Sequence, residues 1–571
     1  MKYFYRTRLN LNVCLFGIIL ISFFLRIWGV DFGLPEILHT DEWFEVKRAL
    51  KLGSGVVDFD RVTKGGYYYL LFVFFAVYYL IMKSFGVYSS GGDLLVGLFS
   101  DPTHIWLIGR TTTVFLGTLT CFFIYLIGKN IHSKSTGIIS ALFLSVNLIH
   151  VRSSHYITVD VPLAFLIVVS FYLMIRKPVD VAYVIKDYVL LAMVIAAAIM
   201  TKIPGAVIFL SFFWFHWRNV EDETSSVRTF KRFFDVRLLC FFVVFLLVYL
   251  IGNPGIIFKA KKIFLWFVSF FYSSDSASVV RGPEFPHFYS SESPIVFYLK
   301  SLFPYKYFFL NISIIFGIFV TLAKFKKYLI FNLFFLAYLF FLFSSKSVEH
   351  VYPRYLLPVV PLMGIYFGIL CSNIYSSFKN KAGKHLTLFF ISILLFFSLV
   401  PCVIDVINLN IDFSKPDTRL LAKEWVHENI PEKSSVFVEG NVYRSSPTTV
   451  PLFMSPELIF SNNQSMTLED QKSIFYTSIK TAYLKKKTYK LIFTSDEYSI
   501  KNALEVGEGD YIILRSSILD NFKFPKNREQ FPRFYQLVKL IDMGIYKKIA
   551  EFKPSSIVMG PELLIFRKIS S

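Results

Sequence analysis

The chain has 571 residues, of which 54% are hydrophobic and only 18% are charged. A typical soluble domain carries about 25% charged residues and cannot bury so much apolar surface. Apolar runs close to the roughly 20 residues that cross a bilayer recur along the first 400 or so positions, as in a polytopic membrane protein.

The net charge is +20, with 60 Lys and Arg against 40 Asp and Glu. A basic balance can indicate nucleic acid binding. Here the Lys and Arg residues gather in short loops between apolar runs, which is the pattern of the positive-inside rule. We therefore expect a membrane lipid environment and no nucleic acid partner. The five cysteines all lie in apolar stretches and form no CxxC pair, so neither a disulfide framework nor a zinc site is expected.

The apolar runs predict about eleven spanning helices. The first starts in the cytoplasm, where Lys2, Arg6 and Arg8 hold it. The predicted spanning segments are 11–30, 110–128, 136–151, 160–176, 186–201, 203–217, 238–252, 304–323, 328–344, 355–376 and 386–404. If the apolar stretch 67–86 also spanned, every later basic loop would fall outside. We therefore expect 67–86 to lie on or dip into the outer face.

The composition changes after Asp405, where charges and alternating patterns appear. Residues 1–404 are predicted to form the membrane module, with a large first outer loop at 31–109. Residues 405–571 are predicted to form a soluble α/β domain on the outer side. It would hold a helix at 417–430, which Pro431 ends, and strands in SSVFVEG, YKLIFTS, YIILRSS, SSIVMG and ELLIFRK.

The HTDEW segment is the first candidate for chemistry. His39, Asp41 and Glu42 follow the first helix by about a dozen residues, at the membrane surface. Adjacent carboxylates there suit general-base catalysis. A hydrated surface loop is the alternative, because a DE pair is common.

Asp160 is the second candidate, in RSSHYITVDVPLAF at the outer mouth of an apolar helix. A carboxylate near the hydrocarbon boundary is costly and is often functional. It would equally serve as a helix N-cap, since Pro162 follows. Arg152 and His155 precede it and are suited to holding an anion or contacting lipid headgroups.

Lys64, Lys202 and Arg354 form a third, cationic group, each predicted at the outer end of an apolar segment. Together they suit a phosphate carried on a lipid in the outer leaflet. The alternative for each one is snorkelling to headgroups. His287, in the long loop after residue 252, is a further candidate acid or base, although such a histidine is more often a plain loop residue.

The sequence contains no GxGxxG, GxxxxGK[ST], HExxH or GxSxG motif. We therefore expect no nucleotide cofactor and no metal site.

The order of these pieces resembles the polyprenyl-phosphate-sugar glycosyltransferases of the C-type membrane fold. The similar groups are the dolichyl-phosphate-mannose protein mannosyltransferases and the bacterial lipid A aminoarabinose transferases. The resemblance covers about residues 10–400 and rests on HTDE, a Lys-Gly-Gly-aromatic stretch from Lys64, Arg110 opening a helix that ends YLIGKN, RSSHYITVDVPLAF, TKIPG and RYLLPVVP.

The resemblance implies a first outer loop with surface helices and an acidic motif that faces the active site. Asp41 would match the catalytic acid, Asp160 the acid at the start of a later helix, Lys64 a donor-phosphate lysine and Arg354 a late cation. Thr63 and Phe44 stand where the aminoarabinose enzymes have an acid and an arginine. These two departures speak against aminoarabinose as the sugar.

The resulting expectation is an inverting glycosyltransferase in a bacterial inner membrane. It would move a sugar from a polyprenyl-phosphate-linked donor to a hydroxyl acceptor (a protein, lipid or glycan) on the outer face. A transporter or flippase of lipid-linked or envelope substrates is the alternative. A transporter would usually show inverted repeats and ionisable residues near the midplane, and we find no such repeat.

Overall fold

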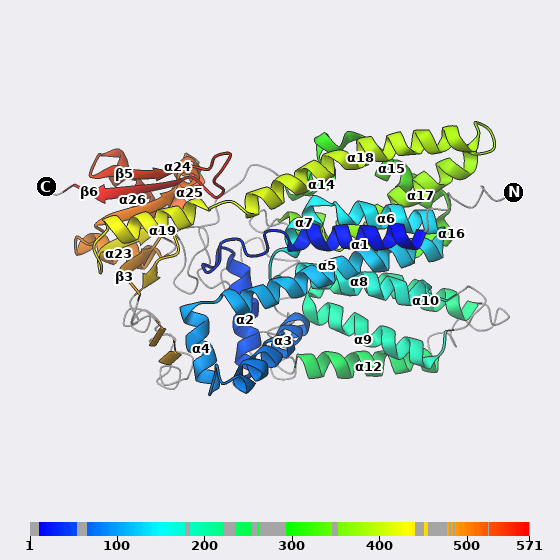
Figure 1. The fold of residues 1–571 in the computed structure, drawn as a ribbon, viewed down its shortest axis with the longest axis horizontal. Helices are drawn as coiled ribbons and strands as arrows, with labels where there is room; N and C mark the ends of the chain where they lie inside the picture. Colours follow the sequence, from blue (N-terminus) through cyan, green and yellow to red (C-terminus); the bar gives the residue numbers. More distant parts are fainter. Residues whose placement is uncertain are drawn as a thin grey trace.

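A computed structural model describes most of the chain (Figure 1). The described residues are 11–53, 65–177, 183–221, 235–253, 261, 293–344, 352–439, 450–454, 477–478, 481–482, 486–494, 496–523 and 525–569.

Apolar helices form a bundle, as expected for a polytopic membrane protein. Among the described residues, six helices are long and apolar enough to cross a membrane, or up to seven if one bent pair counts as a single span. The predicted total of about eleven spans stays a prediction. The bundle helices are α1 (Leu11–Ile27), α5 (Thr103–Ile131), α6 (Lys134–Ser145), α8 (Asp160–Ile175), α9 (Ile185–Thr201), α10 (Ile208–Glu221), α12 (Val236–Gly252), α15 (Phe308–Ala323), α16 (Phe325–Phe343), α17 (Val360–Phe378) and α18 (Lys384–Phe413).

The helices α2 (Thr40–Gly53), α3 (Gly65–Ser84) and α4 (Gly91–Ser100) gather at one end of the bundle. In Figure 1, α2 and α4 run across the direction of the bundle helices and α3 runs obliquely. The start of α3 packs on the end of α9, where a Cβ on Gly66 would come within 2.9 Å of the Ala197 carbonyl oxygen. By length and hydropathy alone, α3 is able to cross a membrane. Its expected place on the outer face therefore stays a prediction.

Basic residues gather at the opposite end of the bundle. This end holds the end of α5, the start of α6, the ends of α8 and α10, the start of α16 and the turn between α17 and α18. The described basic residues there are Lys129, Lys134, Arg176, Lys177, Lys186, Arg218, Arg237, Lys324, Lys326, Lys327, Lys379, Lys381 and Lys384.

The C-terminal domain is an α/β domain, as predicted. Its sheet has the strand order β2-β3-β1-β4-β6-β5. The strands β2 (Phe453–Met454), β3 (Thr488–Phe493), β1 (Ser435–Val438) and β4 (Tyr511–Arg515) are parallel, and β6 (Leu563–Lys568) and β5 (Tyr546–Phe552) add an antiparallel edge. One apolar core lies on each face of the sheet, one under α19 (Thr418–Asn429) and the other under α23 (Glu497–Glu505) and α26 (Pro532–Asp542).

One strand prediction in this domain is wrong, and two strands were not predicted. The segment SSIVMG forms no strand, and only Met559 makes an isolated bridge, to Asp417. The strand β5 was not predicted, because its exposed lysines and single buried residue, Tyr546, give no apolar run. The short strand β2 was also not predicted.

The C-terminal domain contacts the loop that carries the HTDE motif. The helix α18 continues to Phe413, past the predicted boundary at residue 404, and leads into α19. From α19, Lys423 forms an ion pair with Glu36, and Arg419 donates to the Leu38 carbonyl oxygen over 3.1 Å. Lys486 donates to the carbonyl oxygens of Phe99 and Ser100 at the end of α4. The C-terminal domain therefore contacts the first outer loop both before α2 and after it, at the end of α4.

A buried arginine organises the helix break that precedes Asp160. The predicted helix 136–151 is in fact two helices, α6 and α7 (Leu148–Ser154), bent by 60°. Arg26, in the last turn of α1, donates to the carbonyl oxygens of Leu144 (2.9 Å) and Ser145 (3.2 Å) and lies 3.0 Å from Nδ1 of His150. A helix end leaves its last carbonyl groups without partners. Arg26 therefore satisfies two of these at the break.

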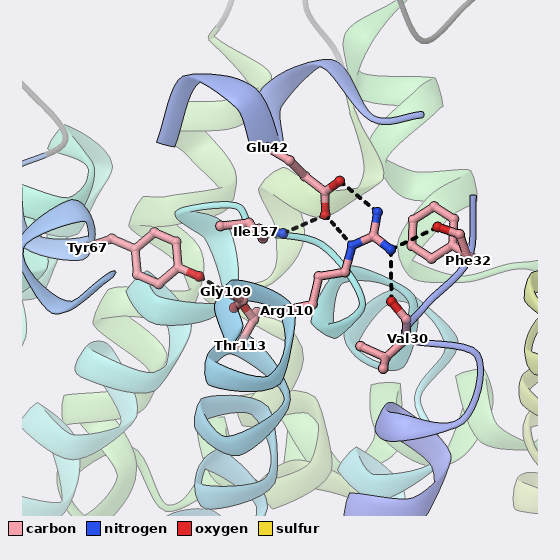
Figure 2. Close-up of polar contacts among 8 residues, drawn as sticks. All are labelled: Val30, Phe32, Glu42, Tyr67, Gly109, Arg110, Thr113 and Ile157. Atoms are coloured by element: carbon pink, nitrogen blue, oxygen red, sulfur yellow. Dashed lines mark hydrogen bonds and ion pairs between the residues drawn. The ribbon is translucent and has the colours of Figure 1, made fainter. Parts of the chain in front are cut away.

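A second buried arginine fixes the start of α2. Glu42 is fully buried, and its two carboxylate oxygens accept from Nε (2.8 Å) and Nη2 (2.9 Å) of Arg110 on α5 (Figure 2). Arg110 also donates to the carbonyl oxygens of Val30 and Phe32, and the Ile157 amide donates to Glu42. This one ion pair joins α2, α5, the chain after α1 and the chain before α8.

The pairing of Glu42 corrects its predicted role. Residues one apart on a helix point about 100° away from each other, so Asp41 and Glu42 face different partners. Glu42 faces Arg110 and the backbone and has no surface left for a substrate. It is a positioning residue and not a catalytic one.

We expect Glu42→Ala to lower the free energy of unfolding by about 3–5 kcal/mol, because it leaves the Arg110 guanidinium buried without its counter-ion. Thermal and denaturant unfolding of the detergent-purified full chain would measure this. The double variant Glu42→Ala/Arg110→Ala should lose less stability than the sum of the two single variants, because the pair acts as a unit. Additive losses would contradict the pairing.

Candidate functional site

Four side chains from separate parts of the sequence form one charge network, namely Asp41, Arg354, Asp160 and Lys202. The Arg354 guanidinium lies 2.7 Å from an Asp41 oxygen and 3.4 Å from an Asp160 oxygen. Nζ of Lys202 lies 2.6 Å from the other Asp160 oxygen. Acids and cations therefore alternate in a chain from Asp41 to Lys202. The sequence predicted that these residues share one pocket, and the structure brings these four together.

The ends of the helices favour the charges that they carry. Asp160 begins α8 and Lys202 caps the end of α9. A helix dipole stabilises a negative charge at its start and a positive charge at its end. Pro204 follows Lys202 in a short 3-10 helix (Ile203–Val207), and Pro353 opens another (Pro353–Leu356) that carries Arg354. These prolines break the chain so that each charged side chain sits at a bend.

Two tyrosines flank the cations. Nζ of Lys202 lies 4.0 Å from the ring centroid of Tyr355, and the Arg354 guanidinium carbon lies 4.4 Å from that of Tyr352. An aromatic face attracts a cation and shields it from water. Burial by itself lowers the pKa of Arg354, but the carboxylates of Asp41 and Asp160 outweigh it and raise the pKa above its ordinary value. Arg354 is therefore a fixed positive charge.

Exposure differs along the network. The side chain of Asp41 is 35% exposed, whereas that of Asp160 is 5% exposed. Asp41 is thus the more accessible acid, and Asp160 is the one that contacts both cations. This asymmetry separates two carboxylates that the sequence treated alike.

A cavity of about 350 Å³, here called the chamber, opens beside Arg354. Arg354, His39 and Arg152 line it, together with apolar side chains of α15 and α17. At another part of its wall, Lys306 pairs with Asp405 over 2.6 Å, and the hydroxyl group of Tyr307 donates to the same carboxylate. The chamber is therefore amphipathic, with cations along an apolar wall.

His39 belongs to this chamber. Its ring contacts that of Tyr156, with centroids 4.2 Å apart and the ring planes tilted by 31°, and its Nδ1 has no hydrogen-bond partner among the described residues. Burial lowers the pKa of His39 below its ordinary value, and the charges of Asp41 and Glu42 oppose that effect only in part. The ring is therefore neutral near pH 7, with an unused nitrogen.

The remaining candidate residues do not all lie at the chamber. Arg152 is exposed and lines the chamber. His155 does not line it, because its two ring nitrogens contact the carbonyl oxygens of Val151 (2.9 Å) and Trp28 (3.0 Å) in the buried core. The expectation that His155 holds an anion or contacts lipid headgroups is therefore wrong, and this histidine ties α7 to the end of α1. Lys64 and His287 lie outside the described residues. In the part of the chain that the structure describes, no group of three His, Cys, Asp or Glu residues is arranged to hold a metal ion.

Sequence reasoning did not name Arg26, and it named Arg110 only as part of the family resemblance, without a structural role. Arg26 and Arg110 each interrupt an apolar run, and an ionisable residue within such a run is by default structural or functional. That signal was available for both. Nothing in the sequence pattern distinguishes Tyr352 and Tyr355 from the many other aromatic residues.

Comparison with known proteins finds a matching family model and a related protein. Residues 106–254, about a quarter of the chain, match the family model for dolichyl-phosphate-mannose-protein mannosyltransferase. An uncharacterized protein of Aquifex aeolicus is 25% identical over 288 residues, which are 49% of this chain and 50% of that protein. The chain thus spans about half the length of this relative.

Among solved structures, ArnT from Cupriavidus metallidurans bound to undecaprenyl phosphate aligns with a TM-score of 0.50 at 11% identity, covering 98% of each chain. The Archaeoglobus fulgidus oligosaccharyltransferase AglB, bound to an inhibitory peptide and a dolichol-phosphate, aligns with a TM-score of 0.48 at 12% identity, over 88% of this chain and 69% of that one. At such identity, the ArnT likeness shows the fold alone. The chain therefore resembles the C-type membrane glycosyltransferases, in its fold and in the segment that matches the mannosyltransferase model.

Proposed function

We propose that this protein transfers a sugar from a polyprenyl-phosphate-linked donor to a hydroxyl acceptor, which is a protein, lipid or glycan. The observation that carries the proposal is the position of Arg354 between Asp41 and Asp160, with Lys202 beside them. Such a transfer needs a base for the acceptor and cations for the departing phosphate, and the charge network supplies both. The mannosyltransferase family match and the ArnT-like fold support the same reaction class.

The cations hold the donor phosphate in this mechanism. Arg354 and Lys202 lie together at the end of the bundle, and Lys64 is the third donor-phosphate residue proposed from the sequence. A guanidinium and an ammonium group form strong charge-assisted hydrogen bonds with phosphate oxygens. Negative charge grows on that phosphate as the bond to the sugar breaks, so cations held in place beforehand stabilise the transition state.

Asp41 acts as the general base. It removes the proton from the acceptor hydroxyl group while that oxygen attacks the anomeric carbon and the lipid phosphate leaves from the opposite side. The anomeric configuration is therefore inverted. Without substrate, Asp41 is neutralised by Arg354 at 2.7 Å. A bound phosphate competes for the same guanidinium, and this competition makes the Asp41 carboxylate a better proton acceptor when the donor is present.

The basic end of the bundle supports the orientation. Positively charged loops stay in the cytoplasm, so the charge network and the C-terminal domain lie on the outer side. In a bacterium this is the periplasmic side of the inner membrane. The chamber beside Arg354 gives an amphipathic substrate a route to the network from the outer leaflet.

Asp41→Asn should lower sugar transfer by about 10²–10⁴-fold, because it removes the general base. The assay uses the full chain in liposomes with a panel of polyprenyl-phosphate-linked sugars and membrane extracts as acceptor, and counts the glycan product. Asp31→Asn, an exposed carboxylate on the same loop, is the matched control and should keep full activity. Near-wild-type turnover of Asp41→Asn, in a variant shown to be folded, would refute the base assignment.

Lys202→Gln should weaken inhibition by undecaprenyl monophosphate by at least about tenfold, since it removes one charge-assisted contact to phosphate. Inhibition constants measured at fixed donor concentration give this value directly. Lys83→Gln, at the far end of α3, should leave the constant unchanged. A loss of turnover with an unchanged inhibition constant would mean that Lys202 only supports Asp160 and does not bind the donor.

A further inference from the structure

A second cavity lies at the end of the bundle opposite the charge network. It has a volume of about 230 Å³ and is called here the basic pocket. The ends of α5, α8 and α10 and the start of α16 enclose it, at the end of the molecule that lies farthest from the C-terminal domain (Figure 1). Its polar and charged lining includes Asn130, Lys177, Trp214, Arg218, Asn219 and Lys327.

The basic pocket has an excess of positive charge. Lys177, Arg218 and Lys327 line it, and no carboxylate does so among the described residues. Lys177 is neutralised by Asp187 at 2.6 Å, and Arg176 shares that carboxylate. Arg218 and Lys327 have no ion pair among the described residues. Two cations that converge on one cavity repel each other unless an anion lies between them.

The remaining groups of the pocket suit an anion with several acceptor oxygens. Asn130 and Asn219 bring amide groups, and Trp214 brings an indole ring, whose N–H only donates. Arginine and lysine together are the usual side chains for phosphate. The volume lies below the 300–1,000 Å³ typical of drug-sized ligands. It therefore suits a phosphate group with a small alcohol and is too small for a nucleotide sugar.

Snorkelling to lipid headgroups is the simpler explanation for basic residues at a membrane surface. It fits Lys324 and Lys326, which are exposed and do not line the basic pocket. Lys327 is exposed as well, but it lines the pocket. Lys327 follows directly on the same helix start but faces the pocket, together with Arg218 from another helix. Two cations from different helices therefore line one pocket together with two amide side chains, which distinguishes them from isolated basic residues at the membrane surface.

We propose that the basic pocket binds a phosphate ester anion at the membrane face opposite the charge network and thereby ties the ends of α5, α8, α10 and α16 together. The phosphate belongs either to an anionic phospholipid headgroup or to a small soluble phosphate ester. The site is separate from the proposed transfer chemistry and does not depend on it.

The test titrates the purified full chain, in a neutral detergent, with dioctanoyl phosphatidylglycerol, inorganic phosphate or dioctanoyl phosphatidylcholine, and follows the midpoint of thermal unfolding. We expect phosphatidylglycerol to raise the midpoint in a saturable way and phosphatidylcholine to have no effect. Lys327→Gln and Arg218→Gln should each weaken the apparent affinity by at least about tenfold. A response to inorganic phosphate as strong as the response to phosphatidylglycerol identifies a soluble ester as the ligand, and a response to the lipid alone identifies a headgroup.

Lys326→Gln is the matched control, because it removes the same charge one residue away without touching the pocket. If Lys326→Gln weakens the response as much as Lys327→Gln, or if no anion gives a saturable response, the proposal is overturned. Arg218→Gln lies on a different helix, so it decides the question even if Lys327→Gln fails to fold. Sugar transfer is not part of the readout, so failure here leaves the proposed function untouched.

Discussion

The site depends on how charge is neutralised at the edge of an apolar bundle. Ionised groups are stable there only when each one has a counter-ion and hydrogen bonds. Asp160, almost fully buried, satisfies this condition by contacting both Arg354 and Lys202. Because Arg354 also contacts Asp41, the start of α2 must lie beside the starts of α8 and α17. The same electrostatic requirement that pairs these groups therefore assembles the charge network from four separate parts of the chain.

Two further arginines fix the positions of the elements that carry the charge network. Arg110 fixes Glu42 and with it the turn that presents Asp41. Arg26 donates to two carbonyl oxygens at the break between α6 and α7. From this break the chain runs along the wall of the chamber to Asp160. Both side chains are fully buried, and their partners include several backbone carbonyl oxygens. The four residues of the charge network lie at helix ends or in a short 3-10 helix, whereas Arg110 lies within the long helix α5 and Arg26 in the last turn of α1.

Much of this arrangement was predictable from the sequence. Apolar runs and basic loops give the bundle, and acids and cations at one set of helix ends give the convergence of Asp41, Asp160, Lys202 and Arg354. The helix break at 146–147 was not predictable, because the apolar period continues across it and a tertiary contact from Arg26 stabilises the bend. Glu42 was misassigned because composition does not show which of two adjacent carboxylates faces a buried arginine. The strand β5 was missed because it lies at a sheet edge, where four of its seven residues are exposed and the burial pattern does not alternate.

A cryo-EM structure of the full chain with bound undecaprenyl monophosphate tests the central claim most directly. The account predicts the phosphate within hydrogen-bonding distance of Arg354 and Lys202, with Asp41 released from Arg354 and facing the chamber. A phosphate bound elsewhere, with Arg354 still joining Asp41 and Asp160, would contradict it.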